Sequence, residues 1–171
     1  MLPELQKRKV ANALHNLGYD FNHFVLMDFV EYVAAQRSKK ISVMDVPLSD
    51  DTFGAWITTE EVDYILVSET THTVHRAHNI LHEIAHMVLE HPPLLLNGVL
   101  PYQIRRILQQ DLLNGHARCV RSNRIYDLPE EREAEEFVFQ IRDLVNRANR
   151  LSELIGTSIP SLRTIFDAQG D

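Results

Sequence analysis

The residues best placed to do chemistry lie in the segment Asn79–His91, which contains His82-Glu83-Ile84-Ala85-His86. Leu, Ile, Ala and Met dominate this segment and favour a helix, in which His82 and His86 lie one turn apart on the same face. Two imidazoles in this relation can bind one Zn²⁺, and Glu83 then lies where it can take a proton from a zinc-bound water. The pattern therefore predicts a catalytic zinc site, and the alternative is a buried helix whose histidines are hydrogen-bonded.

A catalytic zinc site needs a further protein ligand, because such sites use three protein groups and leave one position open. We interpret the single cysteine, Cys119, as a small buried residue, so a carboxylate is required. Glu131 and Glu135 are four residues apart and share one face of a predicted helix. We expect Glu131 to bind the metal and Glu135 to accept a hydrogen bond from a liganding imidazole. The neighbouring acidic residues are interpreted as a solvated first helical turn: Glu130, Glu133 and Glu136.

The sequence does not assign a group that stabilises an oxyanion. The candidates are His75, His78, His91, His116, Tyr102 and Tyr126. His75 and His78 fall within about 40° of His82 around the helix axis, at 100° per residue. They could line a cleft or be ordinary surface residues.

Hydrophobic periodicity predicts the elements that must position these groups. Gly18 is expected to cap the first helix, Thr71 or Thr73 to cap the motif helix, and Pro92-Pro93 to end it. The last long helix is expected to start at Asp127 or Leu128. The expected helices span 3–17, 21–37, 73–90, 102–113, 127–149 and 160–166, with a strand at 41–48, a turn at 49–51 and a hairpin formed by 54–59 and 63–68.

These elements predict an α+β fold in which a small, mostly antiparallel sheet packs on a helical bundle that carries the motif helix. A chain of 171 residues suits one domain. We divide it into N-terminal helices (1–40), the sheet with the motif helix (41–91), the helices with the third ligand (92–150) and a tail with a short helix (151–171).

Composition narrows the functional classes. The chain is 44% hydrophobic and 24% charged, as expected of a globular protein, and its net charge of −7 argues against a nucleic-acid-binding surface. One cysteine cannot form an internal disulfide, which fits a reducing compartment. We find neither a signal peptide nor an apolar run long enough to span a membrane, and therefore expect a cytoplasmic protein without membrane contact.

The motif His82-Glu83-Ile84-Ala85-His86, with Glu131-Arg132-Glu133-Ala134-Glu135-Glu136-Phe137 downstream, resembles the ImmA/IrrE family of zinc metallopeptidases. The similarity extends over roughly residues 41–141. It implies a minimal zincin-like fold of the gluzincin type, zinc ligands at His82, His86 and Glu131, and a general base at Glu83. It also implies an intracellular endopeptidase that cleaves a helix-turn-helix repressor and thereby relieves repression.

The chain departs from that family at several positions. It has Glu135 where the family usually has Asn or Asp, Val138 where a small residue is usual, and His78 where an aromatic residue is common; the Leu-Leu-Met-Pro ending is missing. Two other functions stay open: a zinc-stabilised interaction protein that binds a regulator without cutting it, which Glu135 favours, and a toxin component of a two-gene system, which fits the size and charge of the chain. The oligomeric state is not assigned.

Overall fold

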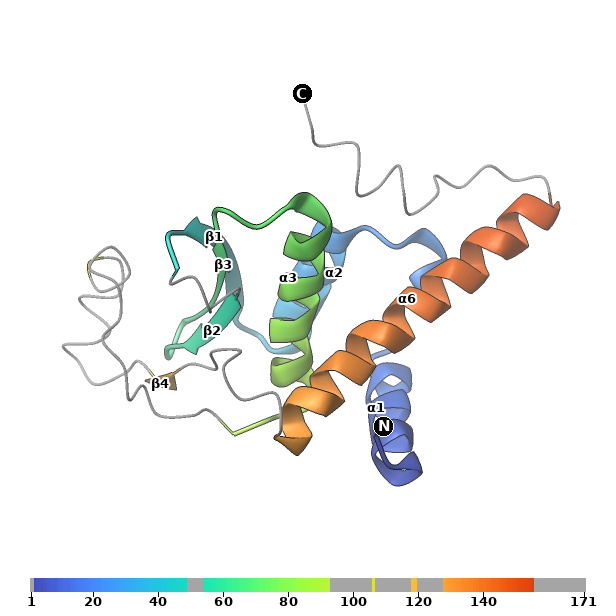
Figure 1. The fold of residues 1–171 in the computed structure, drawn as a ribbon, viewed down its shortest axis with the longest axis horizontal. Coiled ribbons are helices and arrows are strands. Elements are labelled where there is room, and N and C mark those ends of the chain that lie inside the picture. The colour runs from blue at the N-terminus through green and yellow to red at the C-terminus, as the bar shows by residue number, and fades with distance from the viewer. Residues whose placement is uncertain (1, 49–53, 93–105, 107–117, 120–127, 156–171) are drawn as a thin grey trace.

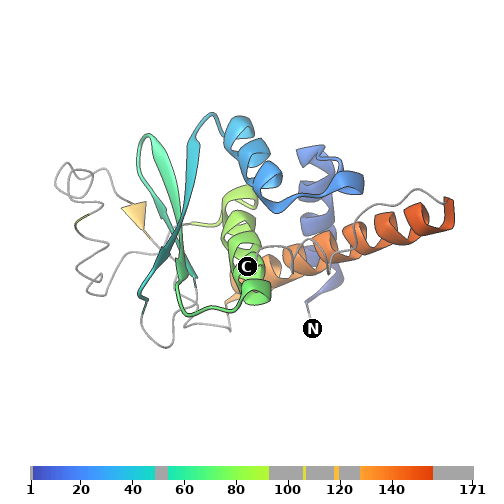
Figure 2. The ribbon, with the colours of Figure 1, turned by 90° about the horizontal axis from the view of Figure 1, so that it is seen from above.

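The computed structural model describes residues 2–48, 54–92, 106, 118–119 and 128–155. Figures 1 and 2 show the sheet on one side, α2 and α3 in the middle, and α1 and α6 on the other side, which confirms an α+β fold. In chain order the elements are α1 (Glu4–Leu17), the 3₁₀ helix η1 (Phe21–His23), α2 (Leu26–Gln36), β1 (Lys40–Val46), β2 (Gly54–Thr58), β3 (Val62–Ser68), α3 (Thr73–Val88), β4 (Arg118–Cys119) and α6 (Pro129–Ile155).

The sheet has the strand order β1-β3-β2-β4. β2 and β3 form the predicted antiparallel hairpin, and β4 pairs antiparallel with β2. The sheet is nevertheless mixed rather than mostly antiparallel, because its longest pairing joins β1 and β3 in parallel. β3 lies between β1 and β2 and runs parallel to β1 and antiparallel to β2. Alternating residues identify a strand but not its partner, and the sequence therefore could not show this.

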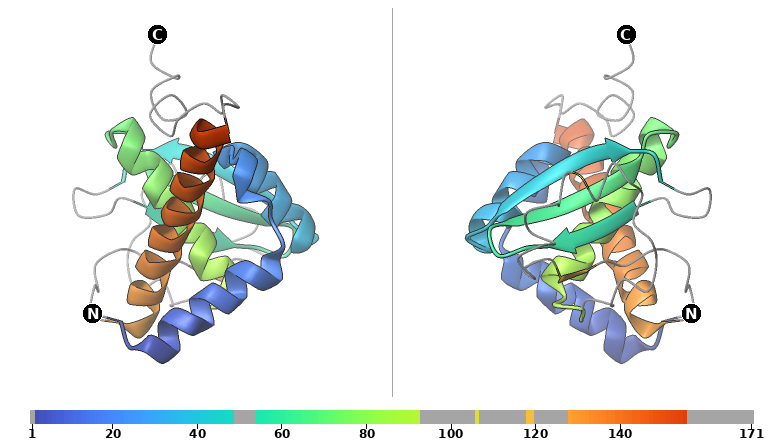
Figure 3. Two further views of the ribbon diagram at one scale, coloured as in Figure 1. Left: turned by 90° about the vertical axis from the view of Figure 1, so that its right-hand side faces the viewer. Right: turned by 90° about the vertical axis from the view of Figure 1, so that its left-hand side faces the viewer.

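One face of the sheet carries α2 and α3 (Figure 3). Trp56, Ile65 and Val67 point to this face and join the main core, which also contains Ile80 and Ile84 of α3. Alternate residues of the strands form a separate apolar cluster: Val46, Ala55, Ile57 and Leu66. The helix that carries the motif is therefore fixed against the sheet by its apolar side.

Two arginines hold α3 at its two ends. Arg76, in the first part of α3, forms two hydrogen bonds with Asp45 of β1, at 2.8 and 3.1 Å. Arg37, which follows α2, pairs with Asp63 of β3 at 2.9 Å and donates to the carbonyl oxygen of Met87 at 3.1 Å. A cation that meets the last carbonyls of a helix also interacts favourably with the helix dipole.

One predicted helix end is confirmed, and a predicted helix start and a predicted helix cap are wrong. α1 ends as expected, with Gly18 in the left-handed conformation at φ 69°. α2 begins at Leu26 rather than at 21, because Asp20 accepts a hydrogen bond from the backbone N–H of Asn22 and closes a separate 3₁₀ turn. The cap position of α3 is His72, without a side-chain cap, and not Thr71 or Thr73.

α6 continues to Ile155, beyond the predicted end at 149, and packs on α3 and α1. Its buried residues Ala134, Phe137, Val138, Ile141 and Val145 join the main core. Within the described ranges, no helix combines the length and the apolarity needed to cross a bilayer. The turn expected at 49–51 and the helix expected at 160–166 lie outside the described residues, as does the helix expected at 102–113 except for the helical residue 106.

Candidate metal centre

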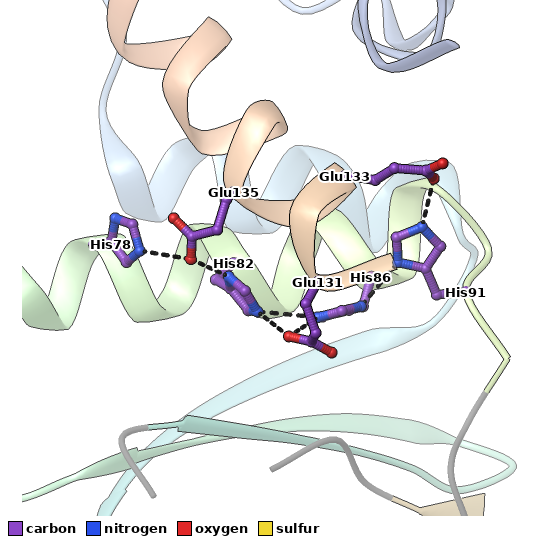
Figure 4. Close-up of polar contacts among 7 residues, drawn as sticks. All are labelled: His78, His82, His86, His91, Glu131, Glu133 and Glu135. Carbon is purple, nitrogen blue, oxygen red and sulfur yellow. Dashed lines mark hydrogen bonds and ion pairs between the residues drawn. The ribbon is translucent and has the colours of Figure 1, made fainter. Parts of the chain in front are cut away.

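The side chains of His82, His86 and Glu131 point toward one another where α3 meets the first turns of α6 (Figure 4). Glu131 Oε2 lies 3.0 Å from His82 Nε2 and 3.6 Å from His86 Nε2, and the two Nε2 atoms are 3.1 Å apart. All three residues are buried. We call His82, His86 and Glu131 the inner triad.

The local packing explains why the two helices present these groups to each other. Ile80, Ile84 and Met87 of α3 are buried in the core, while residues 82 and 86 lie one turn apart beside them. On α6, Ala134 is fully buried in the main core, one turn after Glu131. Glu131 is consequently held within reach of both imidazoles.

The inner triad fits a zinc ion. Its two imidazole nitrogens and one carboxylate oxygen lie within 4.8 Å of one another, which is the donor set of many catalytic zinc sites. Burial alone would lower the pKa of His82, but hydrogen bonds to Glu131 and Glu135 and the charge of Glu83 raise it to about 10. Burial alone would raise the pKa of Glu131, but its contacts with His82 and His86 lower it. The surroundings therefore favour positive charge at this point, as a cation site requires.

Glu135 lies on the other side of the His82 ring. Its Oε1 is 3.0 Å from His82 Nδ1 and 3.3 Å from His78 Nε2. Hydrogen bonds from His78 and His82, opposed by burial, lower the pKa of Glu135 to about 2. The ionised carboxylate can hold the His82 ring with Nε2 turned toward Glu131, which is the arrangement expected from the sequence.

His86 has a support of its own, which the sequence did not indicate. Its Nδ1 lies 2.8 Å from Nδ1 of His91, and Nε2 of His91 lies 3.0 Å from Oε2 of Glu133. Lys9 of α1 donates to the same oxygen of Glu133 at 2.6 Å. The interpretation of Glu133 as a solvated residue is therefore wrong, since it is 4% exposed. His91 is not free to stabilise an oxyanion either, because both its ring nitrogens are engaged.

The backbone at the end of α3 brings His91 into this position. Glu90 adopts a left-handed conformation at φ 54°, and the N–H of His91 bonds back to the carbonyl of His86 at 3.0 Å. This is the Schellman arrangement, for which glycine is the usual residue. It turns the chain before Pro92, so that residue 91 folds back beside residue 86.

Glu83 is fully buried and lies toward the sheet. A β-carbon at Gly54, the first residue of β2, would lie 3.0 Å from Glu83 Oε1. Such a distance is too short for an unstrained contact, so the glycine provides the space in which the carboxylate lies. Glu83 is also close enough to His82 for its charge to raise the pKa of that imidazole.

The structure describes only some of the other predicted site residues. His75 is exposed in the first turn of α3, and Tyr102, His116 and Tyr126 lie outside the described residues. A shallow open depression of about 580 Å³ lies beside the centre; its lining residues are Leu2, His82, Glu131, Arg132, Glu135, Glu136 and Phe139.

Comparisons of the chain with protein-family models, with curated proteins and with solved structures give no match. The resemblance of the two motifs to the ImmA/IrrE family therefore stays a prediction.

Proposed function

We propose that this protein is a zinc-dependent peptide-bond hydrolase with a minimal zincin-like fold. The observation that carries the proposal is the convergence of His82, His86 and Glu131 within 4.8 Å, with Glu83 on the same helix beside them. A purely structural metal site does not need a general base next to its ligands. The resemblance of the two motifs to the ImmA/IrrE family supports the same function.

The inner triad would hold the zinc ion, which supplies a Lewis acid that polarises the scissile carbonyl and lowers the pKa of water. Glu83 takes a proton from the attacking water and later gives it to the leaving amine. Glu135 and His91 keep the rings of His82 and His86 oriented with Nε2 toward Glu131. Gly54 leaves the space in which the Glu83 carboxylate lies.

By the same resemblance, we propose a helix-turn-helix repressor as the substrate, cleaved to relieve repression. Such a substrate contacts this chain as a protein, and the net charge of −7 fits a function without direct nucleic-acid binding.

One observation favours a second function, a zinc-stabilised interaction protein. The three ligands are buried, with side chains at most 8% exposed, and a closed environment is typical of structural zinc. In that case the ion would tie α3 to α6 and the chain would bind a regulator without cutting it.

Glu83→Gln separates the two functions, because it keeps the size of the side chain and removes its basicity. We expect the variant to retain zinc and its fold but to produce no new peptide termini when incubated with a proteome-derived peptide library analysed by mass spectrometry. Glu130→Gln, on the first turn of α6, is the matched control and should cleave like the wild type. If the zinc-loaded wild type produces no new termini, hydrolysis is excluded in favour of the interaction protein.

A further inference from the structure

The arrangement of the inner triad recurs one helical turn away. His78, His82 and His86 follow each other at intervals of four on α3, and Glu131 and Glu135 do so on α6. The two helices run in opposite directions here, since Glu131 meets His82 and His86 while Glu135 meets His78 and His82. His78, His82 and Glu135, which we call the outer triad, therefore repeat the two imidazoles and one carboxylate of the inner triad. Their ligand atoms also lie within 4.8 Å of one another.

The two triads differ in their access to solvent. The side chain of His78 is 30% exposed and that of Glu135 is 51% exposed, whereas the inner ligands are buried. A hydrated ion can therefore reach the outer triad and keep water molecules in its remaining coordination positions.

Residues of both triads line the depression beside the centre. His82 and Glu131 of the inner triad and Glu135 of the outer triad all line it. Together with Glu136 it contains three carboxylates against one guanidinium, that of Arg132. Clustered negative charge raises the local concentration of cations and speeds their arrival.

His82 belongs to both triads through different nitrogens. Its Nε2 faces Glu131 and its Nδ1 faces Glu135. A neutral imidazole has one ring nitrogen with a free lone pair, so His82 can bind an ion in only one triad at a time. Its other ring nitrogen carries the proton and donates it to the carboxylate of the other triad. An ion at the outer triad thus has three protein ligands only while the inner triad does not use His82.

We propose that His78, His82 and Glu135 form a second divalent-cation site, which captures zinc at the surface and passes it to the inner triad. Transfer requires no large movement, because the His82 ring already lies between both sets of ligands (Figure 4). The proposal concerns metal binding and does not depend on whether the protein hydrolyses peptides.

Equilibrium titration with Zn²⁺ against a chromophoric zinc indicator tests the site. Glu131→Gln weakens the inner triad but keeps His82, and this variant should still bind one zinc ion. Adding His78→Ala should abolish that binding, whereas adding His75→Ala, which removes an exposed histidine from the same helix, should not. Loss of all zinc from Glu131→Gln, or equal binding by its His78→Ala derivative, would overturn the proposal. His86→Gln in place of Glu131→Gln provides a second background if the first variant does not fold.

Stopped-flow uptake of Zn²⁺ tests the capture role. His78→Ala alone should lose the rapid phase of uptake yet reach the same final occupancy of the inner triad, and His75→Ala should behave like the wild type. An unchanged rapid phase in His78→Ala would show that the ion reaches the inner triad by another route.

Discussion

Replacing His91 by alanine tests whether the hydrogen bond between His86 and His91 increases the zinc affinity of the candidate metal centre. If zinc binds, His86 would give Nε2 to the ion, and its Nδ1 would carry the proton and donate it to Nδ1 of His91, which lies 2.8 Å away. Without zinc, the His86 ring can adopt its other tautomer and direct Nε2–H toward Nε2 of His82 and Oε2 of Glu131, which lie 3.1 and 3.6 Å away. The loss of the acceptor therefore costs more free energy in the loaded protein than in the unloaded one.

The expected magnitude follows from the burial of the donor. His86 is fully buried, and a buried donor without an acceptor costs about 1–3 kcal/mol. A water molecule that enters the space left by the imidazole would recover part of this cost. Since about 1.4 kcal/mol corresponds to a tenfold change in affinity, we expect His91→Ala to weaken zinc binding about ten- to a hundred-fold, the range typical for residues that support metal ligands.

Zinc affinity is measured by competition with a chelator of known affinity, at one pH and ionic strength. Asn149→Ala, which removes another buried polar group farther along α6, is the control for a general loss of stability. It should lower the free energy of unfolding without changing zinc affinity. A zinc affinity of His91→Ala equal to that of the wild type would refute the idea that His91 supports His86.

Three further changes test other parts of the structure. Gly54→Ala should keep zinc but lower peptide hydrolysis by up to about a hundred-fold, because the new β-carbon displaces the Glu83 carboxylate; unchanged hydrolysis would contradict this placement. Glu90→Gly should raise the free energy of unfolding, measured with denaturant, by up to about 1 kcal/mol, since glycine adopts φ 54° without strain; a decrease would argue against such strain. Burial would raise the pKa of Asp63, but hydrogen bonds, including those from Lys39 and Trp56, and the charge of Arg37 lower it. The ionised Asp63 therefore stabilises the fold above the unfolded-state pKa of about 3.9, and this stabilisation is lost as pH falls through the lower folded-state pKa. Fluorescence of Trp56, the single tryptophan, should report this loss in the wild type, and an identical acid transition in Asp63→Asn would exclude Asp63 as its origin.

Helical periodicity in the sequence was enough to predict that His82, His86, Glu131 and Glu135 would lie together. The spacing of His82 and His86 requires only that the segment be helical, and Glu131 and Glu135 require only a second helix packed on the same face. Both helices exist, and the four side chains meet.

The support of His86 could not be predicted in this way. Glu133 is two residues from Glu131, about 200° around the helix axis, so periodicity places it on the opposite side. It contacts the centre because the left-handed residue Glu90 returns His91 to that side. Nothing in the sequence indicates that a glutamate adopts the left-handed conformation, whereas a glycine at position 90 would have suggested the turn.

The first turns of α6 are held from two opposite sides, by Glu131 against the histidines of α3 and by Glu133 against His91 and Lys9. Helix ends commonly fray, because their first N–H groups have no partner within the helix. Here, local opening of this end would also withdraw a ligand from a bound ion. Departure of the ion would therefore lower the cost of opening the start of α6, and the occupancy of the centre would be transmitted along the helix as a change in its local stability.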